Sequence, residues 1–229
     1  MQRTILITGA NGNLGQDVVN SISAAGHHII ATVGSGEVPE SLIEKTIVQQ
    51  RVDLLNEAAA ESFVHSIVNQ YPSLDGAILL VGGFGMGNIE NTNEAMLDKQ
   101  ISLNFKTAWF IIKPLMTHFK KSGGGQIILI GARPAINPDE GKNVVAYSLS
   151  KSLLISLAEI INTEGKNAGI TASIIIPGIL DTAPNRKAMP DADFEGWVKT
   201  STVAETISFI LSDAGKALRQ PVFKVYNRS

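Results

Sequence analysis

The sequence contains no cysteine, which excludes disulfide bonds, thiolate metal ligands and cysteine nucleophiles. It also lacks long apolar runs, and none approaches the roughly 20 residues of a membrane-spanning helix. The apolar run at the N-terminus breaks at Gly9, too early for the apolar core of a signal peptide. We therefore expect a soluble, cytoplasmic protein without a membrane partner.

The sequence also lacks a large excess of charge of either sign, since it has 19 Lys and Arg and 21 Asp and Glu, for a formal net charge of −2. This balance argues against a surface that binds nucleic acid. The four histidines are scattered and show no HxxH spacing, so no metal site is expected. Hydrophobic residues make up 44% of the 229 residues, enough for one sizeable core. No linker or repeat is found, and we expect a single domain.

Short apolar runs alternate with longer helical patterns. Several runs are apolar almost throughout, as in strands that are covered on both faces. Strand and helix in alternation predict a single α/β, doubly wound parallel sheet of about seven strands, the Rossmann fold. The predicted strands span residues 4–8, 28–33, 47–54, 76–82, 126–131, 170–178 and 222–226. The predicted helices lie near residues 14–25, 57–70, 93–121, 145–167 and 203–212.

The segment TGANGNLG follows the first predicted strand and opens the first predicted helix. Glycine permits a tight turn and a close approach of the backbone to a pyrophosphate, and a helix N-terminus offers free N–H groups. This context favours a dinucleotide site over an ordinary strand-to-helix turn. The residues predicted to form the phosphate-binding turn are Gly9, Asn11, Gly12, Asn13, Leu14 and Gly15.

The end of the second strand should distinguish NAD from NADP. An acidic residue there binds the ribose 2′-OH of NAD, whereas a basic residue favours NADP. Gly34 occupies this position, Ser35 follows it, and no arginine or lysine comes next, so the choice of dinucleotide stays open. Asp53 and Leu54, at the end of the third strand, are predicted to lie beside the adenine. Asp53 could equally cap the next helix.

The segment YSLSK places Tyr147 and Lys151 four residues apart, on one face of a helix. Free tyrosine has a pKa of about 10, and a nearby ammonium should lower it. A phenol tuned in this way can exchange a proton with a substrate near neutral pH. The two residues alone could also be an ordinary surface pair. Ala132, which follows a hydrophobic run upstream, offers no hydroxyl to assist Tyr147.

The order of TGANGNLG, DGAILLVGG, Asn104, YSLSK and PGILDT resembles that of the short-chain dehydrogenase/reductase family over nearly the whole chain. The resemblance implies a seven-stranded Rossmann sheet, NAD(P)H as the cofactor and a small-molecule substrate. It assigns Tyr147 as the acid, Lys151 as the residue that tunes it, and Asn104 as the support of a proton-relay water. Tyr147 and Lys151 are also expected to contact the cofactor, and the lysine can hold the nicotinamide ribose. The further cofactor contacts that the resemblance implies are Gly82, Gly83, Pro177, Gly178, Ile179 and Thr182.

Two departures from the common family pattern stand out. LLVG replaces NNAG, and Ala132 stands where many members have a serine that hydrogen-bonds the substrate. The alanine and the segment LDTAPNRKAMPDADFEGW resemble the dihydropteridine reductase branch, although that branch has aspartate in place of Gly34. Such an enzyme reduces a quinonoid dihydropterin, an electrophilic ring for which one proton donor suffices. The alternatives are a general carbonyl or quinone reductase, and a dinucleotide-binding regulatory protein without catalysis.

The predicted substrate contacts are Phe84, Ala132 and Asn185. The segment at about 180–200, which includes Phe194 and Trp197, is expected to form a lid over the substrate. The apolar helices near 93–121 and 145–167 resemble those that family members pair across a two-fold axis. We therefore expect a homodimer or a homotetramer.

Overall fold

The computed structural model describes residues 1–219 and 222–228. Its centre is a seven-stranded sheet in the order β3-β2-β1-β4-β5-β6-β9, with every pairing parallel. The predicted Rossmann sheet is therefore confirmed. Strand order reverses between β1 and β4, and folds of this kind bind ligands in the crevice beyond the carboxyl ends of the strands at that point. The strands are β1 (Thr4–Thr8), β2 (His28–Val33), β3 (Val48–Arg51), β4 (Leu74–Leu79), β5 (Gly125–Ile130), β6 (Ile170–Pro177) and β9 (Val222–Val225).

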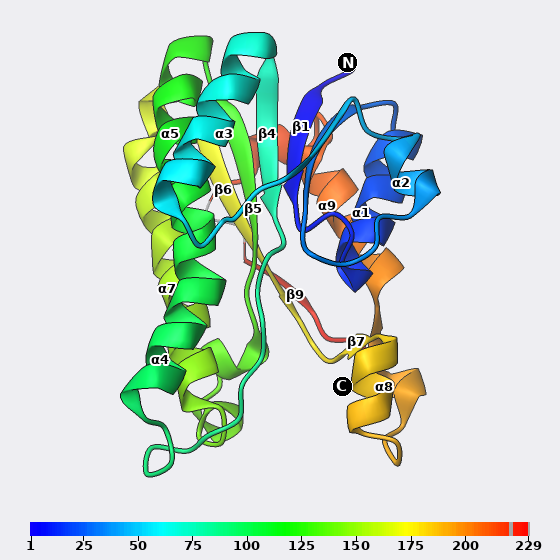
Figure 1. The fold of residues 1–229 in the computed structure, drawn as a ribbon, viewed down its shortest axis with the longest axis vertical. Coiled ribbons are helices and arrows are strands. Elements are labelled where there is room, and N and C mark those ends of the chain that lie inside the picture. Colours follow the sequence, from blue (N-terminus) through cyan, green and yellow to red (C-terminus); the bar gives the residue numbers. More distant parts are fainter. Residues whose placement is uncertain (220–221, 229) are drawn as a thin grey trace.

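Helices cover both faces of the sheet (Figure 1). On one face, α1 (Asn13–Ala24) and α9 (Thr200–Leu211) pack against each other and over Ile5 and Ile7 of β1. On the other face, Leu6 of β1 lies in the core that also contains the buried side chains of the remaining long helices. Successive residues of β1 thus enter opposite cores, as a strand covered on both faces requires. These remaining helices are α3 (Glu57–Gln70), α5 (Thr107–Ser122) and α7 (Val145–Glu164).

The strand predicted at 47–54 ends earlier, at Arg51. Beyond it, the Asp53 carboxylate accepts a hydrogen bond from the backbone N–H of Leu55, over 3.0 Å. Asn56 then caps α3, because its Oδ1 accepts a backbone N–H of the first helical turn. The turn therefore replaces strand pairing after Arg51. The alternative role of Asp53 as the helix cap is wrong, since Asn56 performs it.

The helix predicted near 93–121 runs through three consecutive segments, α4 (Glu94–Ile101), η1 (Ser102–Lys106) and α5. The segment η1 is π-helical and contains Asn104. A π-turn accommodates an extra residue and is frequent at functional sites. The helix ends at Ser122 and is capped by Gly123, whose φ of 91° lies in the left-handed region that glycine adopts readily.

The segment at 180–200 is bounded by a two-stranded sheet of β7 (Leu180–Asp181) and β8 (Val198–Lys199). Between these strands, α8 (Ala183–Ala188) projects away from the main sheet (Figure 1). Trp197 is only 4% exposed, and its ring meets that of Phe194 edge to face at a centroid distance of 4.8 Å. The two ends of this segment are therefore paired with each other, and its C-terminal end is buried at Trp197.

The remaining elements are short, and the sequence patterns did not predict them. In the described residues, no helix is long and apolar enough to cross a membrane. The short elements are α2 (Glu40–Ile43), η2 (Arg133–Ala135), α6 (Pro138–Gly141), η3 (Lys166–Ala168), η4 (Phe194–Gly196) and η5 (Gly215–Ala217).

Candidate functional site

The glycine-rich turn after β1 forms a compact cradle at the start of α1. Gly9 has a φ of 67°, and the N–H of Gly12 donates to its carbonyl over 3.0 Å. A Cβ at Gly15 would overlap that same carbonyl oxygen, so no other residue fits there without movement. The N-cap residue of α1 is Gly12, which has no side chain to cap the first turn. The first N–H groups of α1 are thus available to an anion.

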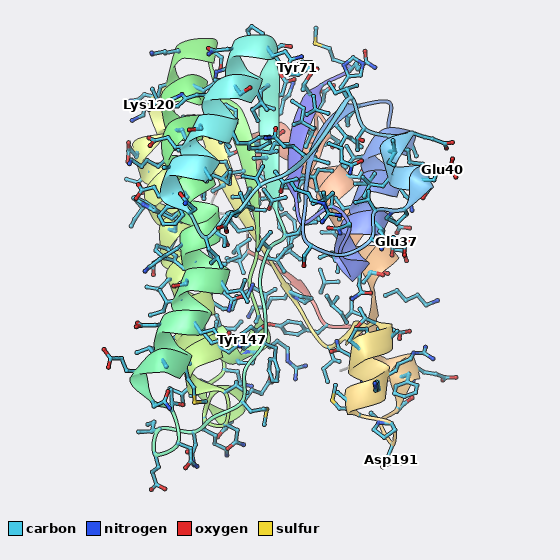
Figure 2. The ribbon with its side chains drawn as sticks, viewed as in Figure 1. Glu37, Glu40, Tyr71, Lys120, Tyr147 and Asp191 are labelled. Atoms are coloured by element: carbon cyan, nitrogen blue, oxygen red, sulfur yellow. The ribbon has the colours of Figure 1, made fainter. Side chains whose placement is uncertain are left out.

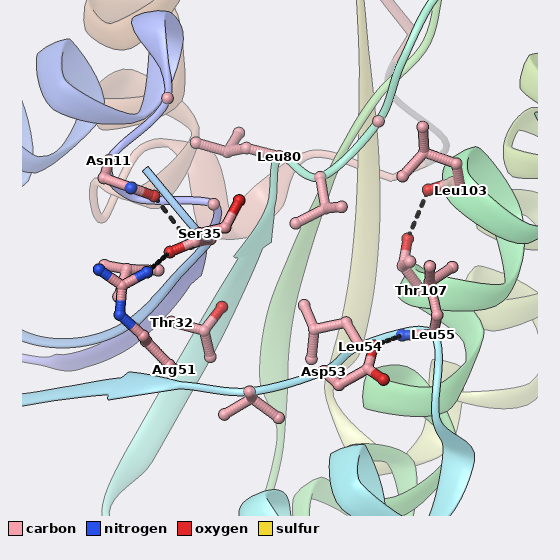
Figure 3. Close-up of a pocket in the computed structure, with 17 residues that line it drawn as sticks. Asn11, Thr32, Ser35, Arg51, Asp53, Leu54, Leu55, Leu80, Leu103 and Thr107 are labelled. Atoms are coloured by element: carbon pink, nitrogen blue, oxygen red, sulfur yellow. Dashed lines mark hydrogen bonds between the residues drawn. The ribbon is translucent and has the colours of Figure 1, made fainter. Parts of the chain in front are cut away.

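A cavity of about 680 Å³ begins at this turn and passes the carboxyl ends of β2, β3 and β4 (Figure 3). Many of its lining residues are among those predicted from the sequence. They are Gly9, Asn11, Gly12, Gly34, Ser35, Asp53, Leu54 and Gly82. Sequence reasoning missed other lining residues, namely Thr32, Val33, Arg51, Val52, Leu55, Leu80, Val81, Leu103 and Thr107.

Arg51 is the charged residue that sequence reasoning missed. Its guanidinium donates to the carbonyls of Gly34 and Gly36, the second over 2.9 Å. Asn11 holds the same loop, because its Oδ1 accepts the N–H of Gly34 over 2.9 Å. In the parallel pairing of β2 with β3, Val33 is the partner of Arg51. This register is the signal that could have shown that a basic residue of β3 lies beside the end of β2.

Tyr147 and Lys151 both lie on α7. The Lys151 Nζ is buried and donates to the carbonyl of Ile130 over 2.8 Å. Burial lowers the pKa of Lys151 to about 8 and raises the pKa of Tyr147 to about 12. The expectation that the ammonium lowers the pKa of Tyr147 is therefore wrong for this structure. Removal of the phenol from water dominates, because the charged phenolate loses its hydration.

Asn104 is fully buried and joins several parts of the site. Its Oδ1 accepts the N–H of Gly83 over 2.9 Å, and its Nδ2 donates to the carbonyl of Gly83 over 3.0 Å. The same Nδ2 lies 2.9 Å from Gln100 Oε1 and 3.1 Å from Ser150 Oγ. Ser150 in turn donates to the carbonyl of Tyr147 over 2.7 Å. The π-turn, the loop after β4 and α7 are thus joined behind Tyr147.

Gly82 lies where the cavity meets this polar network. A Cβ at Gly82 would be 2.7 Å from Asn104 Oδ1 and 3.2 Å from Lys151 Nζ. Glycine is therefore required for the close approach of these groups. Gln100 and Ser150 were not among the predicted site residues, because their role depends on the π-turn and on the packing of α4 against α7.

The three predicted substrate contacts differ in their surroundings. Phe84 is 63% exposed, and its ring meets the ring of Tyr147 edge to face at a centroid distance of 5.1 Å. Ala132 is buried directly after β5. Asn185 donates through Nδ2 to the carbonyl of Leu180 over 2.8 Å, a contact that braces α8. Figure 2 shows Tyr147 in the lower half of the view. Phe84 is thus the predicted substrate contact whose ring packs against the tyrosine.

The predicted cofactor contacts after β6 make backbone and capping interactions. Pro177 ends β6, and the N–H of Gly178 donates to the carbonyl of Val225 over 2.8 Å. The carbonyl of Ile179 accepts the N–H of Val198 over 2.8 Å. Thr182 caps α8. The described lining of the 680 Å³ cavity includes none of the four predicted residues in this segment.

These features fit a dinucleotide. Gly9 has a positive φ, Gly15 has no space for a side chain, no side chain of the N-cap residue occupies the first N–H groups of α1, and the cavity extends from this turn along the strand ends. A pyrophosphate needs such a close backbone approach and such free donors. The fold and the site together define an α/β protein of the Rossmann class with a site suited to a dinucleotide.

Comparisons with known proteins identify the family. A family model described as short chain dehydrogenase matches residues 3–193, and the chain therefore belongs to that family. Its members are oxidoreductases, and so is this chain. A solved structure of a short-chain type dehydrogenase/reductase from Mycobacterium ulcerans has the same fold, with a TM-score of 0.87 at 21% identity, over 100% of this chain and 90% of that one.

Two curated relatives have different named substrates. The chain is 28% identical over 214 residues to a dihydropteridine reductase of Dictyostelium discoideum, covering 90% of this chain and 87% of that protein. It is 26% identical over 200 residues to a 2-dehydro-3-deoxy-D-gluconate 5-dehydrogenase of Dickeya dadantii, covering 83% and 77%. Similarity to these relatives therefore supports the reaction class, and the substrate must be inferred from the residues of the site.

Proposed function

We propose that this protein is an NAD(P)H-dependent reductase in which Tyr147 donates the proton. The observation that carries the proposal concerns Gly82, which lines the cavity and also lies directly against the polar groups of Asn104 and Lys151. A reduced nicotinamide, when bound, would supply hydride. Tyr147, Lys151 and Asn104 are the groups of this chain that would position and protonate the substrate.

The pKa shifts favour reduction. With a pKa of about 12, Tyr147 keeps its proton at neutral pH and can donate it to an acceptor atom. Lys151, with a pKa of about 8, is still mostly charged at pH 7. A cation in the site stabilises the phenolate that forms once the proton has left. Asn104 and Ser150 fix the backbone of α7 at Tyr147.

A flat, electrophilic ring of the quinonoid dihydropterin type is the substrate that we propose. Ala132 provides no side-chain donor, so Tyr147 must supply the proton alone, and such a ring needs only one. The exposed ring of Phe84 beside Tyr147 offers a surface against which a flat substrate can pack. The 28% identity to a dihydropteridine reductase supports the same class. The alternative is a general carbonyl or quinone reductase, which the sugar-acid dehydrogenase relative favours.

The experiment is a panel assay with purified protein. NADH and NADPH are each combined with quinonoid dihydropterin and with a set of aldehydes, ketones and quinones. We expect the highest kcat/KM with the dihydropterin. Faster turnover of simple ketones would favour the general carbonyl reductase. Dinucleotide binding without any turnover would support the non-catalytic alternative.

Two further features belong to this proposal. We propose that the segment at 180–200 acts as a lid, a role supported by its boundaries at β7 and β8 and by the projection of α8 between them. Apolar side chains on α5 and α7 remain exposed and are suited to a contact between two copies of the chain. They are Trp109, Leu149, Leu153 and Ile160. We expect a homodimer or homotetramer by light scattering at micromolar concentration, and a monomer would contradict this.

A further inference from the structure

The cavity holds, at the ends of β2 and β3, an arginine without an acidic partner. Arg51 is exposed, and its two described hydrogen bonds go to the carbonyls of Gly34 and Gly36. Across residues 1–219 and 222–228, no ion pair joins Arg51 to a carboxylate. A guanidinium has five N–H donors, so three remain for a ligand.

The position of this cation carries the inference. In Rossmann folds the adenosine ribose lies at the end of the second strand, where an acidic residue binds the 2′-OH of NAD. Here that position is Gly34, and the arginine that bonds its carbonyl comes from the neighbouring strand β3. We propose that Arg51 binds the 2′-phosphate of NADP(H), so that this protein prefers NADP(H) to NAD(H). The inference rests on the proposed function.

The guanidinium is oriented before any ligand arrives. Two carbonyls hold it on one side, and the bond from the Gly34 N–H to Asn11 fixes the same loop. An ordered donor loses less entropy on binding, and a planar guanidinium matches a phosphate through paired hydrogen bonds. The hydroxyl of Ser35 lies on this loop as a further donor. Figure 3 shows Asp53 displaced from Arg51 along the cavity.

Isothermal titration calorimetry with NADP⁺ and NAD⁺ tests this inference without turnover. We expect wild type to bind NADP⁺ more tightly. Arg51→Met should weaken NADP⁺ binding by about 10- to 100-fold, the range for hydrogen bonds to a charged group, and change NAD⁺ binding little. The matched control is Arg219→Met, because Arg219 is also exposed and also donates to two backbone carbonyls, outside the cavity. It should change neither affinity.

A second variant avoids removing the contacts that Arg51 makes with the loop. The nearest atom to a Cβ at Gly34 would be Asn11 Oδ1, at 3.9 Å, so a side chain has space there. Gly34→Asp should therefore weaken NADP⁺ binding and strengthen NAD⁺ binding, since the new carboxylate repels the phosphate and accepts the ribose hydroxyl.

Three outcomes would overturn the inference. Wild type binding NAD⁺ as tightly as NADP⁺ would refute the preference. Arg51→Met weakening both dinucleotides equally would show that Arg51 only braces the loop. An unchanged preference in Gly34→Asp would place the ribose elsewhere. If wild type binds neither dinucleotide, the proposed function itself fails.

Discussion

The two ends of the site differ in what holds their side chains. At the proposed catalytic end, Asn104 is 0% exposed and is fixed by hydrogen bonds with several elements, and Lys151 is 6% exposed and donates to the carbonyl of Ile130. At the adenosine end, exposed Arg51 rests on the backbone carbonyls of a loop. In the proposed reaction, buried groups would set the proton chemistry through their pKa values, whereas exposed groups can be exchanged with little effect on the core. Catalysis and cofactor choice should therefore respond to mutation independently.

The largest effect is expected for Tyr147→Phe. Only the phenol oxygen is lost, so kcat should fall by about 10²–10⁴-fold, the usual contribution of general acid catalysis. Dinucleotide affinity by calorimetry should stay close to that of wild type. Tyr71→Phe, at the end of α3, is the control and should retain full kcat. If Tyr147→Phe kept the wild-type kcat, another group would be the acid.

A pair of glycine variants tests whether the region around Gly82 is more tightly packed than the loop around Gly36. Gly82→Ala places a Cβ 2.7 Å from Asn104 Oδ1, and such overpacking costs about 1–3 kcal/mol of unfolding free energy. Gly36→Ala places a Cβ 3.4 Å from Asn11 Nδ2, an ordinary contact, and should change stability by less than about 0.5 kcal/mol. Urea unfolding of both variants measures the difference. Equal losses would show that the adenosine end is as tightly packed as the catalytic end.

The pH dependence of the unfolding free energy tests whether the amine of Lys151 is buried. Folding lowers the pKa of Lys151 from its ordinary 10.5 to about 8, so between these values the unfolded chain binds more protons. Stability must then rise with pH across this window. The rise attributable to Lys151 is about 2 kcal/mol between pH 7 and 9.5. Urea unfolding of wild type should show it, and Lys151→Met should lose it. The same slope in both proteins would mean that the amine is solvated.

The smallest effect is expected for Ala132→Ser. With a quinonoid ring one donor already suffices, so kcat/KM should change little. With simple ketones, a second donor stabilises the charge that develops on the oxygen, and we expect a gain of about tenfold or less, below the 10²–10³ of an optimally placed donor. The ratio of kcat/KM for the two substrates is the measurement. Wild type reducing ketones as fast as dihydropterins, with no change in the variant, would refute the single-donor argument.

The parts of the site that the sequence predicted are those encoded by local spacing. The turn at Gly9 to Gly15 and the Tyr147–Lys151 pair each depend on one segment of chain: the turn opens α1, and the pair lies on α7. Arg51 escaped prediction because its place beside Gly34 depends on the register of β2 with β3. Gln100 depends on the π-turn in the same way. The direction of the Tyr147 pKa was wrong because desolvation arises from packing between distant segments.

The position of β1 has a consequence for how the chain is made. Thr4 pairs with His28 on one side and with Leu74 on the other, so the strand that is synthesised before the other six strands of the sheet becomes an interior strand. The edge of β1 that pairs with β4 stays unpaired until β4 has been synthesised, and pairings between residues distant in sequence form slowly. Until then a nascent chain exposes an apolar strand edge that can pair with another chain. The topology of the sheet therefore requires that this strand edge be shielded during synthesis.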